Sequence, residues 1–372
     1  MPLRILAINW RDLKNPLAGG AEVHLEENLR RFVKMGHSVT LLTSNFPDGV
    51  KEEMVEGVRM VRAGNDYTFN WCVPFMLRKE LKKNSYDVVL EDINKVPFYS
   101  PLYQKLPTLV IVPHLFADAV FQEINFVLGF YIYLAEKPIP RVYRGRKFCV
   151  ISESTRQDLT ARGIPAEDVR VIYCGTDFSL YSKDPKVAKE KDPLVVYLGR
   201  LKKYKSVDHL LAAFAKIAVD FPKARLIIIG EGDDHSRLLV ITRKLGIESR
   251  VTYTGFVPKE EKVSWLRKAW VVVCPSLKEG WGLTNIEANA CGTPVVCADV
   301  PGLRDSVSPG KSGLLYPYGQ IEDLAAHLRE VLSNSSLRQK LEAGALEWAQ
   351  QFSWDRAAEE MIKLVCEVAG KK

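Results

Sequence analysis

Short runs of aliphatic and β-branched residues alternate with longer amphipathic stretches along most of the chain. The first run covers residues 4–9, and in the stretch after it Leu25, Leu29 and Phe32 share one helical face. A second run follows at residues 37–43, and the same alternation begins again at residue 194. Strand and helix signals that alternate in this way predict parallel β-sheets in an α/β fold.

The remaining patterns divide the chain into two such series and a helical end. Further strands are predicted at residues 58–62, 87–90, 109–112, 148–151 and 169–172, and then at 194–199, 226–229, 251–257, 270–274 and 295–297. Helical periodicity covers residues 321–332, 337–351 and 354–368. A polar stretch at 179–192 is the predicted linker. We therefore predict domains at 1–178 and 192–352 and a final helix within 353–372.

The most informative segment runs from Val271 to Cys297. A β-branched run ends at Pro275, and a loop with Gly280 and Gly282 follows it. Thr284 is the predicted N-cap of a short helix that ends at Gly292. The loop therefore lies at the carboxyl end of a strand, where open α/β sheets bind ligands.

Two carboxylates in this segment suggest its chemistry. Glu279 lies in the glycine-framed loop and Glu287 lies within the helix. Ionised carboxylates only accept hydrogen bonds, so sugar hydroxyls suit them, and a helix N-terminus suits a phosphate. The segment therefore indicates a site for a sugar joined to a phosphate. The alternative is that both are ordinary surface acids.

Cations follow the first strand of the second series. Arg200 comes directly after Gly199, and Lys205 precedes a helix with Ser206 as its predicted cap. Two cations at a strand-to-helix junction are placed to bind a diphosphate. The alternative is a solvated basic turn, since other lysines are nearby.

Polar residues also follow strands of the first series. The pair Gly19-Gly20 opens a helix and is either a close approach to a ligand or a tight turn, but no G-x-G-x-x-G fingerprint is present. His114 ends another strand and is either a turn residue or a site residue. The residues that we expect to line an acceptor pocket, with a plain polar turn as the alternative for the last three, are Glu22, Asp92, Asn94 and Lys95.

Composition narrows the class of protein. A chain of 372 residues with 47% hydrophobic content can form two cores, and a net charge of +7 is too weak to argue for nucleic-acid binding. The seven scattered cysteines show no metal-ligand spacing, which favours reduced thiols in a cytoplasmic protein. We expect no signal peptide and no transmembrane span.

The most apolar stretch, residues 126–134, leaves two interpretations open. Its length suits a core helix. Because Arg141, Arg144, Arg146 and Lys147 follow it, it also suits a peripheral contact with the inner face of a membrane.

The segment from Glu279 to Glu287, with Gly292-Thr293-Pro294 and the later Gly313-Leu314-Leu315, resembles the paired-glutamate signature of retaining glycosyltransferases of the GT-B fold, family four. The resemblance covers nearly the whole chain. It implies two Rossmann-like domains that face each other across a cleft, with the C-terminal helix crossing back to the first domain. Ser206 departs from the family, in which many members carry glycine at this position.

The resemblance also implies roles for residues. Arg200 and Lys205 neutralise the leaving diphosphate, Glu279 and the backbone of 280–283 hold the donor sugar and its diphosphate, and Glu287 binds the ribose. His114 lies near the donor sugar. The residues expected to contact the donor are Gly19, Gly20, Gly199, Phe256, Val257, Gly280, Trp281, Gly282, Leu283, Thr284 and Glu287.

The predicted function is retaining transfer of a hexose from a nucleotide-diphosphate sugar to a hydroxyl of a glycan, lipid or small molecule. A UDP-sugar is the favoured donor and GDP-mannose is next. We expect no cofactor and no metal ion. The alternatives are an epimerase or hydrolase that acts on a nucleotide sugar, and a non-catalytic protein that binds one. A Rossmann oxidoreductase would need a glycine fingerprint that neither half contains.

Overall fold

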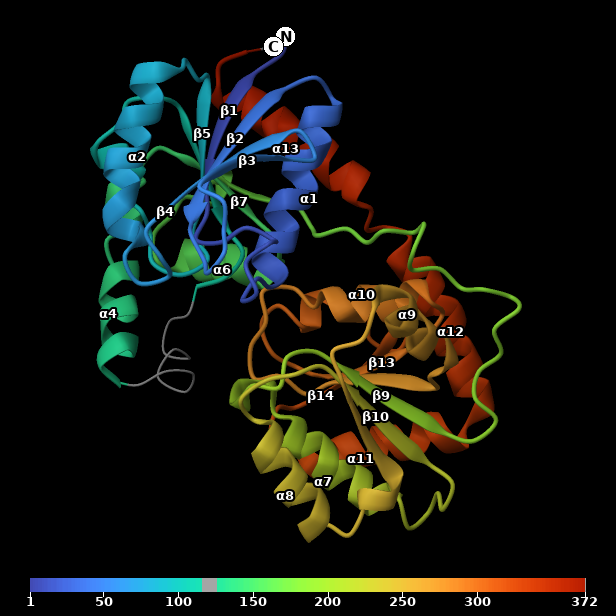
Figure 1. Ribbon diagram of the computed structural model, residues 1–372. Helices are drawn as coiled ribbons and strands as arrows, with labels where there is room; N and C mark the ends of the chain where they lie inside the picture. The colour runs from blue at the N-terminus through green and yellow to red at the C-terminus, as the bar shows by residue number, and fades with distance from the viewer. Residues whose placement is uncertain (116–125, 372) are drawn as a thin grey trace. The chain divides into compact units, whose positions relative to one another are not determined.

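The computed structural model describes residues 1–115 and 126–371, with backbone alone for 126–128. The chain forms two compact α/β units (Figure 1). Unit 1 comprises Met1–Cys174 and Trp354–Lys372, and unit 2 comprises Gly175–Ser353. The stretch expected to be a linker is therefore part of unit 2, where Arg267 donates to the Ser182 carbonyl and Trp270 to the Glu190 carbonyl.

Unit 1 is built on one large sheet in the order β3-β4-β2-β1-β5-β6-β7-β8. All pairs are parallel except β3 with β4. Its strands are β1 (Arg4–Ile8), β2 (Ser38–Ser44), β3 (Glu52–Val55), β4 (Val58–Ala63), β5 (Val88–Asp92), β6 (Thr108–Val112), β7 (Lys147–Val150) and β8 (Val169–Val171). Its helices are α1 (Gly20–Lys34), α2 (Phe69–Lys83), α4 (Phe126–Glu136), α5 (Ile139–Val142), α6 (Glu153–Ala161) and α13 (Trp354–Val368).

Unit 2 has a wholly parallel sheet in the order β11-β10-β9-β12-β13-β14. Its strands are β9 (Leu194–Leu198), β10 (Arg225–Ile229), β11 (Val251–Gly255), β12 (Val271–Cys274), β13 (Val295–Ala298) and β14 (Gly313–Tyr316). Its helices are α7 (Val207–Ile217), α8 (His235–Lys244), α9 (Lys259–Lys268), α10 (Leu283–Ala290), α11 (Ile321–Ser333) and α12 (Ser335–Ala349). The predicted α/β class with two Rossmann-like units is confirmed.

The last helix, α13, crosses back to unit 1 and packs beside α1 (Figure 1). Its apolar residues recur every three or four positions, so they bury one face. The Trp354 ring lies 6.3 Å from the ring of His24, and Arg31 pairs with Asp355 at 2.6 Å. At the other end of the helix, Lys371 pairs with Asp87 at 2.7 Å. The C-terminal helix is thus part of the first core.

Two elements of unit 1 lie outside the sequence-based predictions. The strand β3 forms an antiparallel hairpin with β4, and α2 follows that hairpin. The helix α2 contains Pro74 and carries exposed aromatic residues, so its pattern is not that of a simple amphipathic helix. Its inner residues Phe69, Val73 and Leu77 nevertheless pack into the core of the sheet.

His24 provides a test of the α1–α13 packing. The side chain is fully buried, and neither ring nitrogen has a hydrogen-bond partner in the described part of the chain. Burial lowers its pKa to about 4. Between pH 6.5 and pH 4 the unfolded chain therefore binds a proton that the folded chain does not, and the free energy of unfolding should fall by up to about 3 kcal/mol as the pH falls.

The measurement is denaturant unfolding at several pH values for the native protein and for His24→Leu. Glu26 acts in the opposite direction, because burial raises its pKa to about 7 and the folded chain keeps a proton that the unfolded chain has lost. Since Glu26 is common to both proteins, the difference between their unfolding free energies isolates His24. A difference that does not change between pH 7 and pH 4 would contradict the prediction.

Candidate active site

The strand order of unit 2 places several predicted site residues at one edge of its sheet. The strands β9 and β12 are neighbours in the sheet, but the chain continues from β9 to β10 on one side and from β12 to β13 on the other. The gap between the carboxyl ends of β9 and β12 is therefore a topological switch point. Gly199 and Arg200 follow β9, and the loop with Glu279 follows β12. The structure thus brings together the two motifs that the sequence indicates.

Lys205 and Glu279 form an ion pair at this switch point. Burial alone would lower the pKa of Lys205, but the carboxylate of Glu279 outweighs burial and the pKa is raised. The Leu277 backbone N–H donates to the Tyr204 carbonyl at 2.8 Å, which joins the two loops. Arg200 is exposed and forms no ion pair within the described residues. Its positive charge is therefore available to an anionic ligand.

Glycines allow the loops at this edge to pack closely. A Cβ on Gly230 would lie 2.1 Å from the carbonyl oxygen of Gly199. A Cβ on Gly302 would lie 2.0 Å from the carbonyl oxygen of Glu279. Neither position can accept a side chain without movement of the neighbouring backbone. The loop with Gly302 supports the Glu279 segment, and its Pro-Gly pair is the signal that the sequence analysis did not use.

The helix α10 begins at Leu283, and Gly282 is its N-cap with φ +115°. The prediction that Thr284 caps the helix is wrong, because Thr284 already lies in its first turn. The left-handed backbone at Gly282 ends the loop two residues earlier, which glycine permits. No side chain caps this end and no acidic residue lies in the first turn. The partial positive charge of the helix start is therefore left for an anion.

Glu287 is held within α10 by two neighbours that the sequence analysis missed. Lys262 donates to both of its carboxylate oxygens, at 3.1 and 3.0 Å. Burial and then Glu287 raise the pKa of Tyr181, and the Lys262 ammonium lies 4.8 Å from the Tyr181 ring centroid. Nothing in the sequence pairs these residues, because they come from α9, α10 and the segment before β9.

The other predicted donor contacts in unit 2 differ in accessibility. Trp281 is buried, with its ring 5.3 Å from that of Phe352, so its backbone is the part open to a ligand. Phe256 is 82% exposed beside the end of β11, whereas Val257 is buried. An exposed aromatic side chain at the carboxyl edge is suited to stack on a base.

Ser206 has a backbone conformation that glycine adopts more easily than residues with a Cβ. Its φ of +50° is in the left-handed region. Ser206 is the N-cap residue of α7, as predicted, but its side chain makes no capping hydrogen bond. Its hydroxyl instead makes a 2.9 Å hydrogen bond with the Tyr318 hydroxyl. The bond to Tyr318 compensates in part for the strained backbone.

Two substitutions separate these effects. Ser206→Ala should lower the free energy of unfolding by about 1 kcal/mol, because the hydrogen bond is lost and the strain remains. Ser206→Gly loses the same bond but relieves the left-handed backbone, which costs about 1–2 kcal/mol for a residue with a Cβ, so it should be more stable than Ser206→Ala. Denaturant unfolding of the two variants checks the order, and equal stabilities would contradict it.

Unit 1 has its own switch point, between β1 and β5. Gly19 is the N-cap of α1, and its N–H donates to Glu22 Oε2 at 2.7 Å. Asn94 donates to Asn9 Oδ1 at 2.8 Å and to Glu22 Oε1 at 3.4 Å. Gly20, the first residue of the helix, is exposed. The predicted acceptor residues Glu22 and Asn94 are therefore neighbours.

Asp92 ends β5 and is completely buried. Neither of its carboxylate oxygens has a hydrogen-bond partner in the described part of the chain. Burial and then the charge of Glu22 raise its pKa well above the usual range. Burial in this setting favours the neutral form of the carboxyl group over the ionised form.

Lys95 is more buried than its sequence position suggests. Its ammonium lies 3.7 Å from Asp66 and 5.2 Å from the Trp10 ring centroid. Burial and then the nearby Arg11 lower its pKa to about 8. Arg11 pairs with Asp66 at 2.7 Å, and the sequence analysis missed both residues because they lie in loops without a pattern.

His114 is half-buried and lies two residues beyond β6. The neighbouring Pro113 carbonyl accepts a hydrogen bond from Thr155 at 3.1 Å. His114 is thus at the carboxyl edge of the unit 1 sheet, the same edge as Gly19 and Asn94. Residues 116–125, which follow it, lie outside the described part of the chain.

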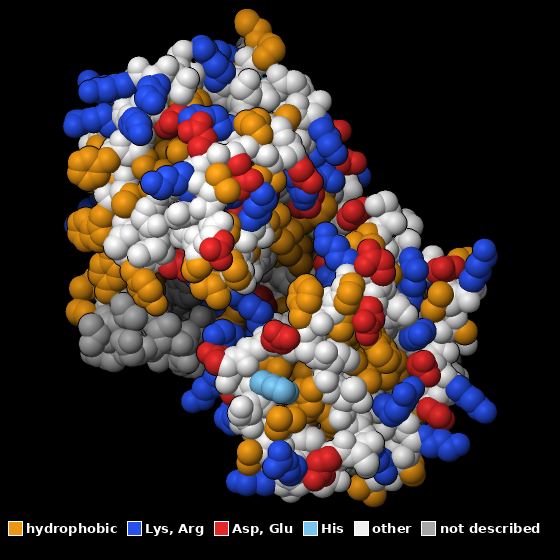
Figure 2. Space-filling model, in the orientation of Figure 1, with side chains coloured by type: hydrophobic (Ala, Val, Ile, Leu, Met, Phe, Trp, Pro, Cys, Tyr) orange, Lys and Arg blue, Asp and Glu red, His pale blue; other side chains and the backbone are white. Residues whose placement is uncertain are grey.

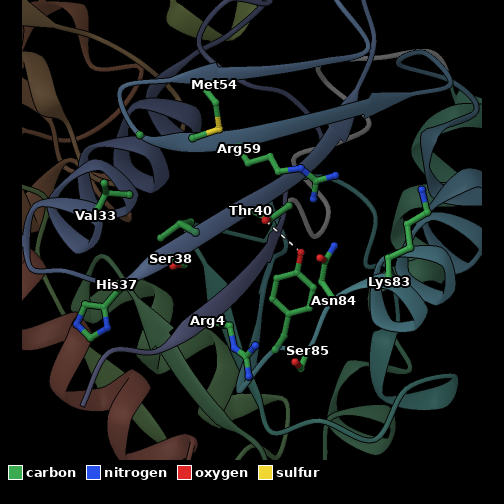
Figure 3. A pocket seen from close by; sticks show the side chains of 13 residues that line it. Arg4, Val33, His37, Ser38, Thr40, Met54, Arg59, Lys83, Asn84 and Ser85 are labelled. Carbon is green, nitrogen blue, oxygen red and sulfur yellow. Dashed lines mark hydrogen bonds between the residues drawn. The ribbon is translucent and has the colours of Figure 1, made fainter.

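A cavity of about 840 Å³ opens at the opposite edge of unit 1 (Figure 3). Arg4 and Ser38 from the starts of β1 and β2 line it, together with Arg59 and Lys83. Tyr86 donates to Thr40 Oγ1 at 3.1 Å in its wall. None of the predicted site residues contributes to this cavity, so it is separate from the candidate active site.

Two family models match this chain. The model described as Glycosyltransferase Family 4 matches residues 18–180, and the model described as Glycosyl transferases group 1 matches residues 182–348. Together they match all but one of residues 18–348.

Among known proteins, the chain is 27% identical to D-inositol 3-phosphate glycosyltransferase of Kribbella flavida, over 92% of this chain and 89% of that one. Several other relatives are matched over less than half of their own length, such as 43% and 47%.

Solved structures share the fold. Sucrose-phosphate synthase from Thermosynechococcus elongatus matches with a TM-score of 0.83 at 22% identity, over 98% of this chain and 99% of that one. HepE of Anabaena, in complex with UDP and glucose, matches with a TM-score of 0.77 at 18% identity, over 98% of this chain and all of that one.

Proposed function

Because this chain belongs to the group 1 glycosyltransferases, we propose that it transfers a hexose from a nucleotide-diphosphate sugar to a hydroxyl group, with retention of the anomeric configuration. The observation that carries the proposal is the arrangement at the unit 2 switch point. There Arg200, the Lys205–Glu279 pair and the uncapped start of α10 lie at one edge of the sheet. This combination of cations, carboxylate and helix N-terminus suits a sugar diphosphate.

The diphosphate is the proposed ligand of the positive groups. Charge builds on the departing phosphate in the transition state, and donors that are already oriented stabilise it without reorganisation. Arg200 supplies the guanidinium, Lys205 the ammonium, and Gly282 and Leu283 the backbone at the start of α10. Glu279 fixes Lys205 and accepts hydrogen bonds from the hexose hydroxyls.

The nucleoside is the proposed ligand of Glu287 and the turn at Phe256. A ribose presents two neighbouring hydroxyls as donors, and the Glu287 carboxylate has lone pairs for them besides those that Lys262 uses. Phe256 stacks on the base. A UDP-sugar is the favoured donor and GDP-mannose is next. The Anabaena HepE structures with UDP and with UDP-glucose support this preference.

The proposed reaction breaks the bond between the anomeric carbon and the phosphate oxygen through an oxocarbenium-like state. The acceptor oxygen forms its bond to the same face of the anomeric carbon, and its proton passes to the departing phosphate. No protein base is assigned, and Arg200 and Lys205 take the place of a metal ion. We further propose that His114 binds near the reacting sugar.

The acceptor is the proposed ligand of the unit 1 edge. Glu22 and Asn94 offer acceptors for hydroxyl groups, Lys95 offers a cation, and the buried Asp92 adds a carboxyl group beside Glu22. This set suits a polyhydroxylated acceptor, whether a glycan, a lipid headgroup or a small molecule.

All seven cysteines are free, which supports a cytoplasmic location. No described helix is long and apolar enough to cross a bilayer.

The test is a thermal-shift and turnover screen with UDP-, GDP- and ADP-sugars in the presence of EDTA, first without acceptor and then with glycan, lipid and small-molecule acceptors. One nucleotide should raise the melting temperature, and its diphosphate should be released slowly. Formation of an isomer, or fast hydrolysis that no acceptor accelerates, would indicate the epimerase or hydrolase alternative. Binding with no turnover under any acceptor would indicate a non-catalytic protein, and no binding would contradict the proposal.

A further inference from the structure

The outer face of α2 carries a stripe of exposed aromatic and basic residues. Tyr67 is 83% exposed, Trp71 71% and Phe75 76%. Residues four apart lie on the same side of a helix, so these three, with Tyr67 just before the helix, point the same way. Lys79 and Lys83 continue the stripe at the same spacing, Arg78 and Lys82 lie directly before them, and all four are exposed. The stripe is aromatic at the start of the helix and basic at its end.

The helix α4 extends the aromatic part of this surface. Phe130, Tyr131 and Leu134 are each between 44% and 47% exposed. Asn70 of α2 donates to the Tyr131 hydroxyl at 3.1 Å, so the two helices meet beside Trp71. Ile132 on the inner side of α4 packs against the same core as α2. The exposed side chains of the two helices therefore form one surface, the α2–α4 face.

The side-chain composition of the α2–α4 face indicates the kind of partner that it binds. Figure 2 shows hydrophobic side chains along this side of unit 1, with basic side chains gathered above them. Large exposed apolar patches mark interaction sites. Aromatic residues that enter the lipid headgroup region, with lysines and arginines beside them, are typical of helices that lie on anionic bilayers. Exposed Arg78 and Lys82 add to the positive charge.

We propose that the α2–α4 face binds the surface of an anionic lipid bilayer. The aromatic side chains enter the interface, and Arg78, Lys79, Lys82 and Lys83 bind lipid phosphates. The sequence analysis considered membrane contact only for the apolar stretch 126–134. The α2–α4 face also includes residues of α2, so the proposed contact surface is larger than that stretch. The N-terminal part of the stretch has no described side chains and is not needed for the proposal.

The aromatic end of the α2–α4 face lies near the candidate acceptor residues of unit 1. Only five residues separate the end of β4 from the start of α2, so the aromatic end of α2 lies at the carboxyl edge of the sheet. Phe69, its first residue, packs on Trp10 with ring centroids 5.9 Å apart, and Lys95 lies over the same Trp10 ring. Under the proposed function, an acceptor carried by a lipid would thus reach the Asn94 edge from the bilayer. That consequence rests on the proposed function, whereas bilayer binding does not.

The test is co-sedimentation of the full chain with phosphatidylcholine vesicles, with and without phosphatidylglycerol, at low and high NaCl. The protein should pellet with the anionic vesicles at low salt and dissociate at high salt. Trp71→Ser/Phe75→Ser should lower the partition coefficient at least about tenfold, because two large apolar side chains no longer enter the interface. Val219→Ser is the matched control, since Val219 is 81% exposed on unit 2, and it should leave binding unchanged.

Charge and insertion have separate readouts. Lys79→Gln/Lys82→Gln/Lys83→Gln should lower binding to anionic vesicles by about fivefold for each residue and should flatten the salt dependence. Brominated lipids should quench the fluorescence of the native protein but less that of Trp71→Phe, which still binds.

Several outcomes would overturn the proposal. The first is that the protein does not pellet with anionic vesicles. The second is that Trp71→Ser/Phe75→Ser binds vesicles as well as the native protein does. The third is that the native protein forms a dimer, which this double variant abolishes, and does not bind vesicles. The last outcome would assign the α2–α4 face to contact between protein chains. Release of nucleotide from the donor, measured without vesicles, should be unchanged in all these variants. Failure of the lipid proposal is therefore distinguishable from failure of the proposed function.

Discussion

Arg200→Ala is expected to lower kcat by about 100- to 1,000-fold with the preferred nucleotide sugar. Arg200 is exposed at the unit 2 switch point and has no ion pair within the described residues, so its charge is free to meet the leaving diphosphate. Loss of one oriented donor to a developing charge costs about 3–4 kcal/mol in the transition state. The affinity for the ground-state donor should fall much less, because its charge is more dispersed.

Steady-state kinetics and donor titration together test this prediction. Lys203→Ala is the matched control: Lys203 is an exposed cation in the same turn, and its removal should change kcat little. An unchanged kcat in Arg200→Ala would refute the role assigned to Arg200. An equal loss in both variants would indicate a general effect of positive charge rather than a specific contact.

Gly302→Ala is expected to lower kcat/KM for the donor by about 100-fold. The new Cβ would lie 2.0 Å from the carbonyl oxygen of Glu279, so the backbone that carries Glu279 must move. Displacement of a positioning group by about 1 Å is enough for a loss of this size. The substitution also introduces left-handed strain, because φ at Gly302 is +83°.

Gly319→Ala separates the close approach from the strain. Gly319 has φ +84°, and a Cβ there would meet nothing within 4 Å. Both variants should lose about 1–2 kcal/mol of unfolding free energy from the strained backbone. Only Gly302→Ala should lose kcat/KM and further stability, which kinetics and denaturant unfolding would measure. Equal kinetics in the two variants would show that the Gly302 loop does not position Glu279.

The sequence alone predicted five of the six strands of unit 2, β9 to β13, and missed β14 and the helices α8 and α9. Its strands are apolar runs bounded by glycine and proline, and its helices have one apolar face, so local residue order carries the information. The left-handed Gly292, with φ +74°, follows α10 as predicted. The region between β2 and β5 was poorly predicted, since the short β3 and the helix α2 with Pro74 have no regular period.

The chemistry of the site was predictable in kind but not in its pairing. The sequence indicated Lys205 and Glu279 separately, and the structure joins them in an ion pair. Lys262, the partner of Glu287, had no signal, because α9 and α10 are separated in the chain by β12 and its loop and come together only in the tertiary structure. Whether Thr284 or Gly282 is the N-cap of α10 depended on one left-handed backbone angle, at a position where a Cβ would lie 2.6 Å from the Ser306 hydroxyl oxygen.

What the sequence determined by itself is therefore the set of strands and helices with regular patterns, the fold class and the residues with site chemistry. These depend on residues near one another in the chain. The tertiary structure decided which charges are paired, that α13 belongs to unit 1, that Asp92 is buried with no hydrogen-bond partner among the described residues, and that Trp71 and Phe75 are exposed. Burial and electrostatic pairing depend on what packs against a residue from distant parts of the chain, and no local pattern contains that information.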